Sequence, residues 1–99
     1  MGNFAVTFEI GQTTSVVPGA QVDALLEQLD RPREGRPGAE ATSVAAVIRP
    51  ALDATPSNAL IEKRFALALL AAIDDAERAT ALNPETQALR APLANLAGI

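Results

Sequence analysis

Residues 3–10 read NFAVTFEI, and this stretch decides the fold class. Every second position carries a large apolar side chain: Phe4, Val6, Phe8 and Ile10. Smaller or polar side chains lie between them. An alternation with a period of two is typical of a β-strand that buries one face. The sequence therefore predicts an N-terminal strand.

A hairpin is predicted directly after this strand. The two-residue loop at 11–12 begins with glycine, which favours the type II′ turn of tight hairpins. The following TTSVV at 13–17 is predicted to pair back, with Ile10 opposite Thr13. Because an isolated hairpin is only marginally stable in water, it must lie on helices or continue into a sheet from another chain.

Two helices are predicted in the next part of the chain. Residues 19–30 carry an apolar stripe at the i, i+3, i+4, i+7 spacing. A second helix is expected after a cap at Thr42 or Ser43, with a kink at Pro50. A short buried strand at 44–48 is the alternative for this segment.

The longest helix is predicted from Thr55-Pro56 to about Leu82. Its middle, FALALLAAI at 65–73, is apolar on every face, so we expect protein around it. A helix of that length would extend roughly 39 Å. A last helix is predicted over 83–96, where an asparagine and a proline start it.

These elements predict an α+β fold, with an N-terminal β-strand or hairpin followed by three to four helices and a long central buried helix. We expect one small domain over residues 1–99, with a flexible loop at 31–41 that is rich in proline, glycine and charge. A chain this short builds a thin core. Such a core favours either close helix packing or burial of the remaining apolar surface against a second copy or another protein.

The composition narrows the possible functions. The chain has no histidine, cysteine, tryptophan or tyrosine, which removes disulfides, thiolate zinc sites and most acid–base and nucleophilic catalysis near neutral pH. We therefore expect no enzyme activity, no cofactor, no metal and no small-molecule substrate. A net charge of −4 makes nucleic acid an improbable partner.

Membrane association is also not expected. The longest apolar run covers nine residues, 65–73, about half of what a bilayer-spanning helix needs. The N-terminus lacks a basic segment followed by an apolar stretch. These features lead us to expect a cytoplasmic protein.

The densest group of carboxylates is Asp74, Asp75 and Glu77, beside Arg78. Asp74 and Arg78 are spaced for an i, i+4 ion pair, and Asp74 and Glu77 share a helix face that could hold a hard cation. We interpret the group first as a solvent-exposed helix end. A carboxylate-based, metal-dependent enzyme is the alternative.

Three arginines lie in the predicted loop: Arg31, Arg33 and Arg36. Guanidinium groups bind phosphates and carboxylates through two parallel hydrogen bonds, so this loop could contact an anion, a nucleic acid or a partner protein. The neighbouring acidic residues Asp30, Glu34 and Glu40 oppose such binding, and no aromatic residue is present to stack on a base. A solvated loop is the simpler interpretation.

The main hypothesis is a non-enzymatic protein-interaction or assembly module that binds another protein or itself as a homo-oligomer. The apolar face of the first strand is most simply core, and pairing with a partner strand is its second interpretation. The candidate partner-binding residues are Phe4, Val6, Phe8, Ile10, Arg31, Arg33 and Arg36. Richness in alanine, arginine and proline indicates a GC-rich coding sequence, so we expect a bacterial or bacteriophage accessory, structural or inhibitor protein.

Overall fold

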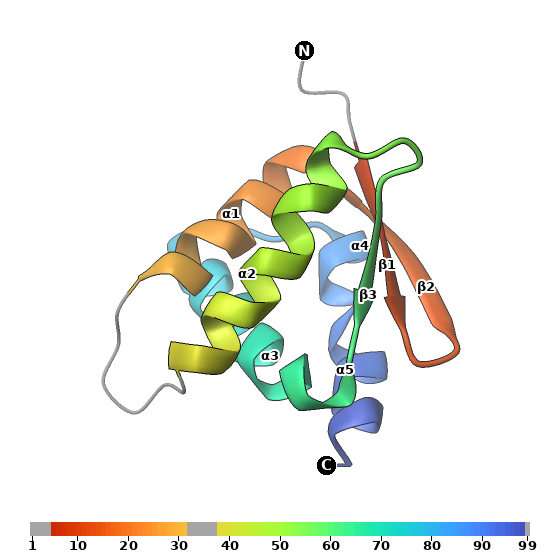
Figure 1. The fold of residues 1–99 in the computed structure, drawn as a ribbon. Coiled ribbons are helices and arrows are strands. Elements are labelled where there is room, and N and C mark those ends of the chain that lie inside the picture. The colour runs from red at the N-terminus through yellow and green to blue at the C-terminus, as the bar shows by residue number, and fades with distance from the viewer. Residues whose placement is uncertain (1–4, 32–37, 99) are drawn as a thin grey trace.

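A mixed three-stranded sheet forms one side of the molecule, and helices pack against one of its faces (Figure 1). The computed structural model describes residues 5–31 and 38–98. The strand order is β2-β1-β3, with β1 at Ala5–Ile10, β2 at Thr13–Pro18 and β3 at Asn58–Ile61. Strand β1 lies in the centre, antiparallel to β2 and parallel to β3.

The predicted hairpin is confirmed in its register and in its turn. Ile10 lies opposite Thr13, as the two-residue loop requires. Gly11 has a φ of +62°. No described non-glycine residue has a positive φ, and this includes Gln12, the second residue of the loop. A positive φ at the first loop position alone distinguishes a type II′ turn from a type I′ turn.

The first predicted helix is confirmed as α1, Gly19–Asp30. The alternative of a strand at 44–48 is wrong, because that segment lies within α2, Gly38–Asp53. The caps expected at Thr42 or Ser43 are wrong too, since α2 begins at Gly38 and continues past Pro50.

The early start of α2 has a packing reason. Its buried stripe begins one turn earlier than expected, with the buried Ala41 in line with Val44, Ala45 and Ile48. Residues 38–41 of the predicted flexible loop are therefore helical. Residues 32–37 of that loop lie outside the described part of the chain.

The long helix predicted from Thr55 to about Leu82 is wrong before Ala66 and after Ala79. Thr55 and Pro56, joined by a cis peptide bond, lie in the connection to β3, and a 3₁₀ turn, η1 at Lys63–Phe65, follows that strand. The helix, α3, covers only Ala66–Ala79. In β3, buried Ala59 and Ile61 alternate with exposed neighbours, and pairing with β1 overrides the local helical preference.

Helix α3 packs between α1, α2 and α5, which makes it the central helix. Seven of its fourteen residues are buried, whereas Leu67, within the apolar segment, remains 58% exposed. The expectation that protein surrounds the whole apolar segment is therefore wrong at that position.

The last predicted helix is split into α4, Pro84–Gln87, and α5, Arg90–Ala97. The Asn83 cap is confirmed, because its side chain accepts a hydrogen bond from the Thr86 N–H. Pro92 explains the break, since its ring would clash with the carbonyl of Ala88 in a continuous helix. The restart at Arg90 places Pro92 in a first turn, where no N–H partner is needed.

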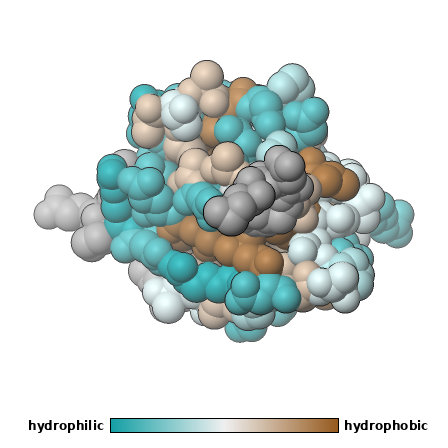
Figure 2. Space-filling view, turned by 90° about the horizontal axis from the view of Figure 1, so that it is seen from above, coloured by the Kyte–Doolittle hydropathy of each residue, from teal (hydrophilic) through white to brown (hydrophobic). Residues whose placement is uncertain are grey.

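The core lies between the sheet and the helices, and the α+β class is confirmed. The radius of gyration is 12.2 Å, close to the value of about 13 Å expected for a domain of this length. Seen from above, hydrophobic residues form a band at the surface between hydrophilic groups (Figure 2).

Candidate interaction surfaces

The strand residues predicted to bind a partner lie inside the molecule. Val6, Phe8 and Ile10 are almost completely buried, whereas Phe4 lies outside the described residues. Both sides of β1 are already paired, with β2 and with β3. A partner strand can therefore pair only with the outer edge of β2 or β3.

The arginine loop is only partly described. Arg31 follows the end of α1, is exposed, and forms an ion pair of 3.0 Å with Glu27. Arg33 and Arg36 lie outside the described residues. The structure therefore brings none of the seven predicted residues together into an exposed site within the described chain.

Two of the three clustered carboxylates on α3, those of Asp74 and Glu77, form ion pairs with a residue of α5. The guanidinium of Arg90 donates to Asp74 and, at 3.2 Å, to Glu77, so it occupies the helix face on which a cation was considered. The hydrogen bond to Asp74 is the largest cause that raises the pKa of Arg90. Within residues 5–31 and 38–98, no cluster of three potential metal ligands is found.

The other two members of this group also differ from expectation. Arg78 pairs with Asp75 at 3.2 Å, so the predicted pair of Arg78 with Asp74 is wrong. Asp75 is only 6% exposed and therefore does not belong to a solvent-exposed helix end. It lies under the Arg78 side chain, one turn before the helix ends.

No helix of the described residues covers the outer face of the sheet (Figure 1). Two large apolar side chains project from it, Val16 on β2 with 54% exposed and Leu60 on β3 with 61% exposed. Between them β1 contributes Thr7 and Glu9, and Glu9 accepts a hydrogen bond of 3.5 Å from Asn58. This face mixes apolar and polar groups and carries a single charge.

The outer edge of β2 presents free backbone groups. Thr7 donates its N–H to the Ser57 carbonyl at 2.7 Å, on the β3 side, so its backbone groups point away from β2. Its cross-strand partner Val16 therefore belongs to a non-hydrogen-bonded pair, and the N–H and C=O of Val16 point outward. The same alternation turns the backbone groups of Thr14 outward. No other described element lies beyond this edge (Figure 1).

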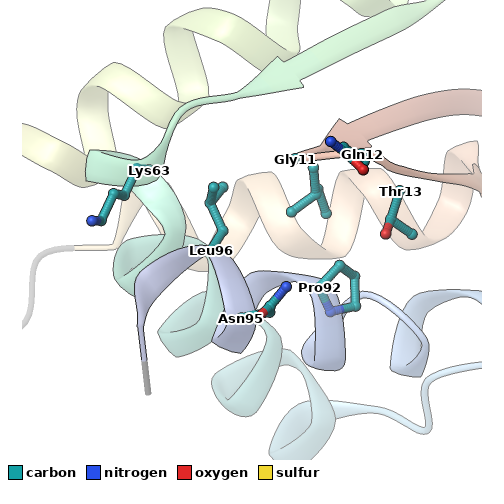
Figure 3. Close-up of a pocket in the computed structure, with 8 residues that line it drawn as sticks. Gly11, Gln12, Thr13, Lys63, Pro92, Asn95 and Leu96 are labelled. Carbon is teal, nitrogen blue, oxygen red and sulfur yellow. The ribbon is translucent and has the colours of Figure 1, made fainter.

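A cavity of about 540 Å³ opens where the hairpin loop meets the last helix. It is lined by residues 10–13, Lys63 and three residues of α5, Pro92, Asn95 and Leu96. The loop residues lie opposite α5, and Leu96 lies between the loop and Lys63 (Figure 3).

A second hollow of about 450 Å³ lies beside the first, lined by Lys63, Arg64, Leu67 and Ala97. Lys63 borders both, and we call the two hollows together the Lys63 groove. Arg64 donates to Glu62 at 3.2 Å and lies over the ring of Phe65. The lining of the groove thus combines apolar and neutral polar residues with a basic rim formed by Lys63 and Arg64.

The composition of β2 indicates an edge that can pair with another strand. The six residues of β2, TTSVVP, include four β-branched side chains and no charge. For the groove there was no local signal, because its walls come from the hairpin, η1 and α5, which are far apart in sequence. Lys63 is the only lysine of the chain.

Comparisons with known proteins return no relative. No family model, no curated protein and no solved structure matches this chain, so the candidate surfaces rest on its own residues. No helix in the described part of the chain has both the length and the apolar content needed to cross a bilayer.

Proposed function

We propose that this protein is a non-enzymatic assembly module that pairs with a second copy of itself through the outer edge of β2. The carrying observation is that residues 13–17 of β2 form an edge that carries neither a charge nor a bulge. Exposed edges in natural proteins usually carry charged residues, inward-pointing charges or bulges that prevent pairing. Strand β2 has none of these charges, and its regular register with β1 shows no bulge.

Self-pairing fits the order of residues along the edge. A two-fold axis at Ser15 would place Thr14 opposite Val16 of the second copy, and each of these pairs would exchange N–H and C=O groups. About four hydrogen bonds would form. β-branched side chains would then face each other on the outer surface, a favourable cross-strand combination.

The two ends of the sheet also favour a closed pair over a longer assembly. Pro18 ends the free edge of β2, because it has no N–H to donate. On the opposite edge β3 has only four residues, followed directly by the charged Glu62, Lys63 and Arg64. A sheet extended through β2 therefore offers no equally good edge for further growth.

The described residues do not support the two alternative functions, which are contact with an anion or nucleic acid through the arginine loop and a carboxylate-based, metal-dependent enzyme. Arg31 is engaged with Glu27, and the carboxylates Asp74 and Glu77 are engaged with Arg90. The proposal keeps the bacterial or bacteriophage origin and the cytoplasmic location inferred from the sequence.

The oligomeric state of Val16→Lys tests this proposal. Sedimentation equilibrium of the wild-type protein from about 10 µM to about 1 mM should show a monomer–dimer equilibrium, because a short edge-to-edge contact gives weak affinity. In Val16→Lys the dimer dissociation constant should rise at least about tenfold, since lysine on an edge strand opposes pairing. Val16 is half exposed, so the monomer fold should persist.

Leu60→Lys is the matched control, because Leu60 lies on the same face of the sheet but on the other edge. Its dimer should remain as stable as that of the wild type. A wild-type protein that stays monomeric at the highest concentration would overturn the proposal. Equal weakening by both variants would place the contact on the sheet face instead of the β2 edge.

A further inference from the structure

We infer that the Lys63 groove binds an extended peptide segment of a partner protein, one that carries a carboxylate side chain next to a large apolar side chain. This site lies at the hairpin end of the molecule and goes beyond the pairing of β2 with a second copy. It does not require that pairing.

The charge argument begins with the ion pairs of the described chain. The arginines at 31, 49, 64, 78 and 90 each contact a carboxylate. Lys63 is the one basic side chain among residues 5–31 and 38–98 for which the structure gives no carboxylate partner. In a chain with a net charge of −4, this ammonium remains available to a carboxylate from outside.

The position of Lys63 suits such a contact. It lies at the border of both hollows, and its ammonium end points away from the hairpin loop in Figure 3. Each hollow that Lys63 borders also contains a large apolar residue, Leu96 in the larger and Leu67 in the smaller. Leu67 is 58% exposed and thus has apolar surface left to bury.

The opposite wall offers hydrogen-bonding groups for a peptide backbone. The side chains of Gln12, Thr13 and Asn95 line the larger hollow and make no hydrogen bond to another described residue. Amide side chains both donate and accept, as a peptide group requires. A cavity of about 540 Å³ lies within the range of about 300–1,000 Å³ typical of ligand sites and accommodates a few residues.

A nucleic acid fits this groove poorly. A strand of phosphates needs several free cations, whereas the rim offers Lys63 and an Arg64 already paired with Glu62. The one aromatic ring nearby, Phe65, is buried and cannot stack on a base. A single carboxylate with apolar neighbours matches the groove better.

Selection from a displayed library of random linear peptides tests the inference. The immobilised wild-type protein should enrich a family that contains Asp or Glu within two positions of Leu, Ile or Phe. Parallel selections should use Lys63→Glu and Arg31→Glu, which change the net charge equally. Arg31→Glu should return the same family, whereas Lys63→Glu should not.

Binding of one enriched peptide then gives the size of the effect. Lys63→Glu should weaken its affinity at least about tenfold, and Lys63→Met, which keeps the apolar stem, should weaken it less. Replacing the acidic residue of the peptide by its amide should weaken binding to the wild type but not to Lys63→Met. The Val16→Lys variant should bind the peptide unchanged, which separates this site from the β2 contact.

Three outcomes would overturn the inference. These are the absence of any enriched family, a family without an acidic residue, and equal binding to wild type and Lys63→Glu. Loss of binding in Arg31→Glu but not in Lys63→Glu would also overturn it, because the site would then lie at the arginine loop.

Discussion

The two faces of the sheet are made by the same strands but differ in what they do. On the inner face Phe8 and Ile61 are almost completely buried, whereas on the outer face their neighbours Glu9 and Leu60 remain accessible. The inner face holds the fold together through burial of apolar surface. The outer face and the free edge beside it should tolerate substitution without unfolding of the molecule, and the contact proposed with a second copy lies there.

The largest expected effect is the difference in the free energy of unfolding that is lost when one residue of each face is replaced by alanine. Phe8→Ala removes a buried ring and should lower the free energy of unfolding by about 3–5 kcal/mol, a large part of the total for a small domain. Leu60→Ala, on the outer face, should lower it by less than about 1 kcal/mol. Urea denaturation of both variants checks this. Similar losses in both would mean that the outer face is also buried.

A smaller effect is expected at a buried polar contact on the covered side. Thr86 is completely buried, and its hydroxyl contacts Gln21 at 3.1 Å and Asn83 at 2.8 Å, which ties α4 to α1. Thr86→Val keeps the shape and removes only the hydroxyl, because the Gln21 side chain still accepts from the Asn83 N–H and the Asn83 side chain from the Thr86 N–H. A loss of about 0.5–1.5 kcal/mol is therefore expected.

Thermal unfolding at low protein concentration measures the effect of Thr86→Val against Thr14→Val, the same change at an exposed position. Thr14→Val should stay within about 0.5 kcal/mol of the wild type. If Thr86→Val were equally mild, the contact between α4 and α1 would contribute nothing to stability.

The smallest effect is expected for Arg90, which lies between the buried and the exposed regions. Arg90→Met removes its contacts to Asp74 and Glu77, but these carboxylates are about half exposed. The loss should therefore be below about 1 kcal/mol and should shrink as salt is added. Urea denaturation at low and high salt checks both points. A large, salt-independent loss would contradict a solvent-screened ion pair.

The sequence predicted those elements whose signal is local. The hairpin follows from alternation over 3–10 and from a glycine at the first loop position, and both features act within a few residues. Helix α1 follows from one uninterrupted apolar stripe. In each case the pattern of side chains and the backbone preference agree, so tertiary contacts had nothing to override.

The errors arise where distant segments decide the structure. Strand β3 has four residues, and only its pairing with β1, about fifty positions earlier, makes it a strand. The partner of Asp74 is Arg90 of another helix, which the spacing along one helix could not reveal. The Lys63 groove likewise exists only because the hairpin, η1 and α5 meet in space.

Amide hydrogen exchange of β2 as a function of protein concentration tests the pairing of two copies most directly. The N–H groups of Ser15 and Val17 bond to β1 and should be protected at every concentration, which provides an internal reference. The N–H groups of Thr14 and Val16 point outward, so they should exchange fast in dilute protein and become protected as the concentration rises. Fast exchange of both at all concentrations would contradict the proposed assembly.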